Sequence, residues 1–110
     1  MPRNEKSSGR LPNTNVMRVM WLRGALRNLH QAVDYIARDN RNAAVDVAER
    51  IIDTATRLEQ HPFLGRPGRL KATRELVVPG LPYVIRYRIS KETVEILRIH
   101  HMAQRWPEES

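Results

Sequence analysis

The sequence contains no cysteine and few aromatic residues. The absence of cysteine excludes disulfides, thiolate metal ligands and thiol nucleophiles. Aromatic side chains make up 5% of the 110 residues, and no segment alternates them with basic residues as a base-stacking surface does. At Trp106, beside Arg105, stacking on a nucleotide base remains an alternative to burial at the edge of the core.

Long hydrophobic runs are also missing. Residues 1–16 are polar, so they predict neither a secretory signal nor a membrane span, and we expect a cytoplasmic protein without a membrane partner. Their low hydrophobicity predicts a flexible extension, with Met17 as an alternative natural start. The length suits a single domain, which we place at residues 17–107, followed by a tail at residues 108–110.

Positive charge is concentrated in part of the chain, whose net charge is +7. Residues 61–105 hold nine lysines and arginines against three glutamates, whereas basic and acidic residues balance between residues 19 and 60. A localised excess favours association with nucleic acid or with an acidic protein, because it raises encounter rates. A basic balance that only maintains solubility is the alternative.

Hydrophobic periodicity predicts two helices placed between strands. Apolar residues follow three-and-four spacing from Ala25 to Ala37 and again from Ala44 to Leu58. Asn40 or Asn42 can cap the second helix, and His61-Pro62 ends it. Strands are predicted at residues 17–22, 73–78, 83–89 and 94–101. The predicted order is β-α-α-β-β-β, an α+β fold in which a helical hairpin packs on one face of a small, mostly antiparallel sheet.

Alternation along the last two strands predicts which side chains face the helices. The helix-facing residues are expected to be Tyr83, Ile85, Tyr87, Ile89, Leu97 and Ile99. The residues expected on the other face are Val84, Arg86, Arg88, Arg98 and His100. We therefore expect an open face of the sheet that is lined with arginines.

The segment Gly65-Arg66-Pro67-Gly68-Arg69 suggests a phosphate-binding loop or a hook for the DNA minor groove. The hook needs an arginine before the first glycine, where Leu64 stands, and the phosphate loop needs a strand-to-helix turn that is absent here. The segment is better explained as the turn between a helix and a strand. Arg66 and Arg69 remain candidates for contact with a partner.

The histidines do not predict a metal site. His100 and His101 are adjacent, and successive residues of a strand point to opposite faces, so they cannot share one ion. His30 and His61 offer no ligand spacing either, and we predict neither a metal nor a cofactor. His100, at the end of a basic strand, is a candidate general acid or base.

Several motifs, in this order along the chain, closely resemble toxins of the RelE/ParE superfamily. They are Ala25-Leu26-Arg27-Asn28-Leu29, Tyr35-Ile36, Gly65-Arg66-Pro67-Gly68-Arg69, Thr73-Arg74-Glu75-Leu76-Val77, Pro82-Tyr83, Tyr87-Arg88 and Val94-Glu95-Ile96-Leu97-Arg98 followed by His100. The resemblance spans residues 17–107 and implies the toxin of a type II toxin-antitoxin pair, held inactive by a cognate antitoxin. ParE-like toxins poison DNA gyrase, and RelE-like toxins cleave messenger RNA on the ribosome.

The resemblance favours the ParE-like branch, whose members act by binding. RelE-like enzymes typically carry an arginine directly after the first tyrosine of a Tyr-Arg-Leu-Val-Tyr strand, and here Val84 stands at that position. The alternative is a ribosome-dependent mRNA endoribonuclease, with Arg74, His100 and Arg105 as its catalytic candidates. A second alternative is a basic RNA-binding protein without enzymatic activity, or a degenerate family member.

Under the ParE-like interpretation, seven residues are expected to contact the target or the antitoxin. They are Arg74, Arg86, Arg88, Arg98, His100, Arg105 and Trp106. The antitoxin is expected to cover part of the sheet and the groove of the helical hairpin. Replacing Arg86 by glutamate is expected to abolish growth inhibition while the fold survives.

Overall fold

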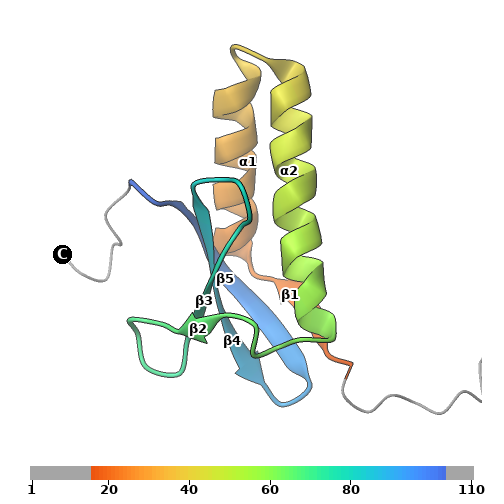
Figure 1. Ribbon diagram of the computed structural model, residues 1–110, viewed down its shortest axis with the longest axis vertical. Helices are drawn as coiled ribbons and strands as arrows, with labels where there is room; N and C mark the ends of the chain where they lie inside the picture. The colour runs from red at the N-terminus through yellow and green to blue at the C-terminus, as the bar shows by residue number, and fades with distance from the viewer. Residues whose placement is uncertain (1–15, 104–110) are drawn as a thin grey trace, which may run out of the picture.

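The computed structural model describes residues 16–103, which form two helices, five strands and one turn of 3-10 helix (Figure 1). In chain order these are β1 Arg18–Trp21, α1 Arg23–Ala37, α2 Arg41–Thr56, the 3-10 helix η1 Arg57–Glu59, β2 Arg66–Pro67, β3 Arg74–Val77, β4 Tyr83–Ser90 and β5 Thr93–His101. The α+β class and the order of the predicted elements are confirmed. The structure adds the two-residue strand β2, where the sequence predicted only a turn.

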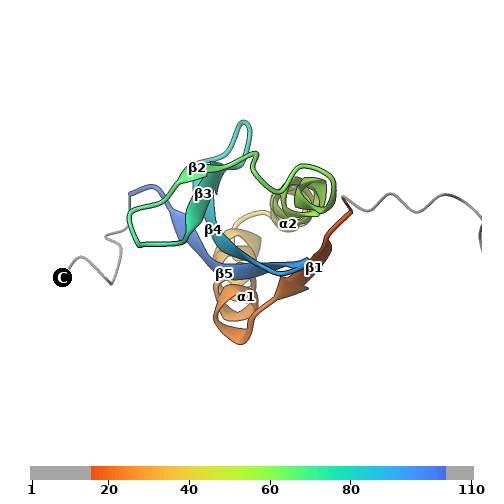
Figure 2. The same ribbon diagram turned by 90° about the horizontal axis from the view of Figure 1, so that it is seen from below.

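The five strands form one sheet in the order β1-β5-β4-β3-β2, which Figure 2 shows from one edge to the other. β3, β4 and β5 form the predicted antiparallel meander, and β2 adds an antiparallel edge beside β3. β1 pairs in parallel with β5, so the first and last strands of the sequence are neighbours. The sheet is therefore mostly antiparallel, as expected.

The two helices form an antiparallel hairpin that extends beyond the sheet (Figure 1). The side chain of Asn40 accepts a hydrogen bond of 3.0 Å from the backbone N–H of Ala43, which confirms it as the cap of α2. α2 ends at Thr56, a few residues before the predicted stop, and η1 continues the chain as a tighter turn.

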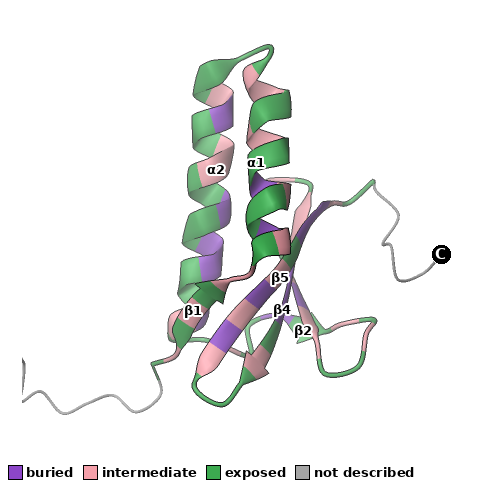
Figure 3. Cartoon of the chain, turned by 180° about the vertical axis from the view of Figure 1, so that it is seen from behind, coloured by how far each residue is buried: buried purple, intermediate pink, exposed green. Residues whose placement is uncertain are grey.

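The hydrophobic core lies between the helices and β4 and β5. Figure 3 shows buried residues on the facing sides of the helices and along these two strands. The core consists of Ala25, Leu29, Ile51, Ala55, Leu58, Val78, Ile85, Tyr87, Val94, Ile96 and Ile99. Because apolar burial is roughly proportional to the area removed from water, this cluster contributes the main stabilisation of the fold.

A β-bulge at Leu97 changes the facing pattern of β5. Arg86 pairs with Arg98 and Tyr87 pairs with Ile96, so Leu97 is an extra residue on the β5 side. The expectation that Leu97 joins the helix-facing core is wrong, since Ile96 and Ile99 occupy the core on either side of the bulge. Strict alternation fails there because the bulge inserts one residue into the period of two.

Neither helix within residues 16–103 has the length and apolar content needed to cross a lipid bilayer.

Candidate functional site

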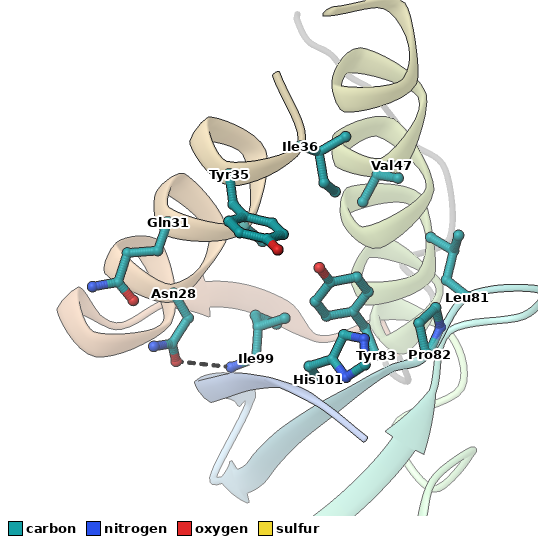
Figure 4. Close-up of a pocket in the computed structure, with 11 residues that line it drawn as sticks. Asn28, Gln31, Tyr35, Ile36, Val47, Leu81, Pro82, Tyr83, Ile99 and His101 are labelled. Atoms are coloured by element: carbon teal, nitrogen blue, oxygen red, sulfur yellow. Dashed lines mark hydrogen bonds between the residues drawn. The ribbon is translucent and has the colours of Figure 1, made fainter. Parts of the chain in front are cut away.

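An open groove lies between the helical hairpin and the ends of β4 and β5 (Figure 4). It has a volume of about 630 Å³. Its lining is Asn28, Gln31, Ala32, Tyr35, Ile36, Val47, Leu81, Pro82, Tyr83, Ile99 and His101. The floor is largely apolar and the rim carries hydroxyl, amide and imidazole groups, which suits a partner segment that is apolar on one side.

The groove is fixed in place by contacts between α1 and the sheet. The Asn28 side-chain oxygen accepts a hydrogen bond of 3.0 Å from the backbone N–H of Ile99, marked by the dashed line in Figure 4. The rings of Tyr83 and His101 meet edge to face, with centroids 5.3 Å apart. Burial, and to a lesser extent the neighbouring Tyr35, raises the pKa of the Tyr83 phenol above its ordinary value of 10.0.

A buried carboxylate organises the arginines on the other part of the sheet. The side chain of Glu75 is only 4% exposed, and Oε2 accepts a hydrogen bond of 3.1 Å from the backbone N–H of Arg69. Guanidinium nitrogens of three arginines also approach this carboxylate. They belong to Arg69 at 3.6 Å, Arg66 at 4.0 Å and Arg86 at 4.0 Å.

The expected open face lined with arginines is wrong at two positions. Arg86 is 1% exposed and His100 is 7% exposed, so neither side chain is available on an open surface. Arg86 lies next to Glu75, its partner across β3 and β4 in the register of the sheet. A strand alternation pattern gives the face of a side chain but not what covers that face, which is why the burial was missed.

Arg74 braces the loop that follows η1. Its Nε donates to the Gly65 carbonyl at 2.9 Å, and its guanidinium lies 5.2 Å from the centre of the Phe63 ring. The same loop is held by the Tyr87 hydroxyl, which donates to the Pro62 carbonyl at 2.7 Å and accepts from the Gly65 N–H at 2.9 Å. A side chain at position 65 would meet the Tyr87 ring at 2.8 Å, so only glycine permits this approach.

Arg88 and Arg98 are the predicted site residues that remain exposed. Arg88 pairs with Glu95 of the adjacent strand at 2.5 Å. Arg98 donates to the Leu97 carbonyl at 2.8 Å, and its guanidinium lies against Gly24 of α1. Arg88 follows Tyr87, the cross-strand partner of Arg74, so the side chains of Arg88 and Arg74 lie on opposite faces of the sheet. The binding roles of Arg88 and Arg98 stay predictions.

Arg105 and Trp106 lie outside the described residues. Three groove residues, Tyr35, Tyr83 and His101, were not among the predicted site residues, although each is a polar aromatic side chain beside an apolar run. Glu75 was missed as well, and its signal was a lone acid within a strongly basic segment. Residues 16–103 hold no group of three histidine, aspartate or glutamate side chains placed to share a metal ion.

Sequence comparison places the chain beside bacterial toxins. A family model described as the ParE toxin of the type II toxin-antitoxin system matches residues 19–106. A putative toxin, Y4kP, from Sinorhizobium fredii is 46% identical over 91 residues, which cover 83% of this chain and 94% of the relative. Toxin RelE2 from Caulobacter vibrioides is 37% identical over 86 residues, which cover 78% of this chain and 96% of the relative.

Two solved structures share the fold. The chromosomal ParDE system from P. aeruginosa superposes with a TM-score of 0.72 at 24% identity, over 79% of this chain and 97% of that one. The toxin-antitoxin complex RelBE2 from Mycobacterium tuberculosis superposes with a TM-score of 0.57 at 25% identity, over 78% of this chain and 98% of that one.

Proposed function

The chain belongs to the ParE toxin family of type II toxin-antitoxin systems, and we propose that it inhibits growth by poisoning DNA gyrase until a cognate antitoxin neutralises it. Its site of action would then be the cytoplasm. The family model and the relatives support a toxin of the ParE/RelE group, and the choice of gyrase rests on the chemistry of the site.

The choice rests on one observation: the candidate nuclease residues that the structure describes are buried or already hydrogen-bonded within the chain. RNA cleavage by attack of a 2′-hydroxyl needs an accessible base, an accessible acid and cations near the phosphate. His100 is buried, and Arg74 is bonded to the loop carbonyl of Gly65. Val84 stands where RelE-like enzymes carry an arginine. These three facts support a toxin that acts by binding.

A ribosome-dependent mRNA endoribonuclease is the second candidate, because the relative from Caulobacter is described as a RelE toxin. Purified chain should be tested on gyrase supercoiling and, in parallel, on ribosome-bound message. We expect blocked supercoiling or trapped cleaved DNA, with intact message. Codon-dependent cleavage of message with normal supercoiling would overturn the proposal.

The groove between the hairpin and the sheet is proposed as the antitoxin site. The two solved relatives are described as a ParDE system and a RelBE2 toxin-antitoxin complex, which supports a protein partner of this class. The groove offers an apolar floor, and Tyr35 on its rim is 70% exposed. We therefore expect an amphipathic antitoxin segment to lie here, with its apolar side on Ile36 and Val47.

A bulky charge in the groove should separate toxicity from neutralisation. The substitution Ala32→Arg fills the groove from a position outside the buried core, whereas Val45→Arg places the same charge on an exposed residue outside the groove. We expect Ala32→Arg to inhibit growth even when antitoxin is co-expressed, and Val45→Arg to be neutralised normally. Equal neutralisation of the two variants would place the antitoxin elsewhere.

A further inference from the structure

We propose that residues 66–75, here called the basic hairpin, bind the phosphodiester backbone of a nucleic acid through Arg66 and Arg69. The basic hairpin comprises β2, the first two residues of β3 and the turn between them. The proposal goes beyond gyrase poisoning, because binding to a nucleic acid can be measured with the chain alone. Its failure would leave the gyrase proposal intact, and the reverse also holds.

The buried Glu75 carboxylate draws the two arginines to one place. Arg69 Nε lies 3.6 Å from Oε2, and Arg66 Nη2 lies 4.0 Å from Oε1. Without this negative charge, guanidinium groups so close together would repel one another. Both approaches are longer than a bidentate hydrogen bond, so the carboxylate acts on the two guanidinium groups mainly through its charge.

The backbone of the basic hairpin is built to hold that arrangement. The Gly68 N–H donates to the Thr73 carbonyl at 2.8 Å, and the Thr73 hydroxyl donates to the Leu70 carbonyl at 2.6 Å. A Cβ atom at position 68 would lie 2.5 Å from the Thr73 hydroxyl oxygen, so glycine is required for this close turn. The arginines therefore project from a hydrogen-bonded turn, and pre-organisation of this kind reduces the entropy lost on binding.

Exposure and charge favour a polyanion as the ligand. The Arg66 side chain is 75% exposed, and Arg69 and Lys71 are exposed beside it. Glu75 is the sole acid between residues 66 and 75, and its carboxylate faces inward. Two guanidinium groups along an extended segment match the repeated phosphates of a nucleic-acid strand, where each contact releases a counterion.

The first test measures the salt dependence of binding. The full chain, made by cell-free synthesis, is titrated with a short mixed-sequence DNA duplex between about 50 and 200 mM salt. The double variant Arg66→Gln/Arg69→Gln should reduce the slope of log K against log salt by about 2. The matched control Arg27→Gln/Arg41→Gln removes the same charge from exposed helix positions and should leave the slope nearly unchanged.

The second test distinguishes binding at a defined site from general electrostatic attraction, because the two predict opposite changes in affinity for DNA. Glu75→Gln makes the chain more positive, so general attraction to DNA predicts tighter binding. Binding at a defined site predicts lower affinity, because Arg66 and Arg69 lose the carboxylate charge that positions them. If Glu75→Gln does not fold, the double variant decides alone, since both of its replaced side chains are exposed.

A single-stranded RNA probe and an oligoglutamate complete the experiment. The proposal is supported if the double variant, but not the control, loses affinity for DNA or RNA. The nucleic acid for which the loss of affinity is larger identifies the source of the phosphodiester. Equal losses in the double variant and the control would overturn it. Loss of oligoglutamate binding with unchanged nucleic-acid binding would also overturn it and would assign the basic hairpin to an acidic protein.

Discussion

Arg86 is charged and almost fully buried, and the Glu75 carboxylate beside it makes this tolerable. Replacing Arg86 by glutamate would place two carboxylates together in the sheet and remove a cation. Breaking a buried pair in this way typically costs about 3–5 kcal/mol. We therefore expect Arg86→Glu to unfold much more readily in urea, which reverses the sequence-based expectation that the fold survives this change.

Arg88 provides the matched control for Arg86. It lies two residues further along β4, is exposed, and pairs with Glu95. Because exposed ion pairs contribute little, Arg88→Glu should cost less than about 1 kcal/mol. Similar urea midpoints for the two variants would contradict the structural role assigned to Arg86.

Tyr87 joins the loop after η1 to the core through its hydroxyl. The substitution Tyr87→Phe removes a hydrogen bond to the Pro62 carbonyl and leaves the buried Gly65 N–H without its acceptor. We expect the free energy of unfolding to fall by about 1–3 kcal/mol, measured by urea denaturation. Tyr35→Phe, at an exposed position, should change it by less than about 0.5 kcal/mol.

At the scale of elements, the turn between β4 and β5 contains a strained residue. Lys91 has φ of 58°, at the first position of a two-residue turn where glycine is preferred. Lys91→Gly should raise the free energy of unfolding by about 0.5–1 kcal/mol, because glycine adopts this φ without steric cost. Glu92→Gly, without a positive φ, should lower it. Thermal unfolding of the two variants measures this difference in sign.

Helices and strands followed from the sequence because their patterns are local. The two apolar stripes and the Asn40 cap required only spacing and side-chain chemistry. The β2–β3 pair and the bulge at Leu97 depend on contacts between segments, so no local pattern indicated them. The same reason explains why the candidate site was only partly predicted from the sequence. Exposed Arg88 and Arg98 were foreseen, whereas the burial of Arg86 and the central place of Glu75 required the assembled sheet.

At the scale of the whole molecule, burial of Tyr83 beside the groove should make the folded chain less stable at alkaline pH. Burial raises the pKa of Tyr83 above 10.0, so the folded chain retains a proton that the unfolded chain releases. This contribution is complete below pH 10.0 and is lost as pH rises through the higher folded pKa. Urea unfolding at increasing pH should therefore show a steeper loss for the native chain than for Tyr83→Phe. Equal losses would contradict the assignment.

The parallel pairing of β1 with β5 sets the order in which the protein can assemble. Among the strands, β1 leaves the ribosome first and β5 last, so the sheet cannot be completed while translation is still within β4. The helices form through contacts close in sequence and can precede it, whereas closure of the long loop between β1 and β5 is entropically slow. A newly made chain therefore cannot complete its sheet until its last strand emerges. A stop codon before Thr93 would leave β1 without its partner strand and β4 paired with β3 alone, and we expect such a fragment not to inhibit growth.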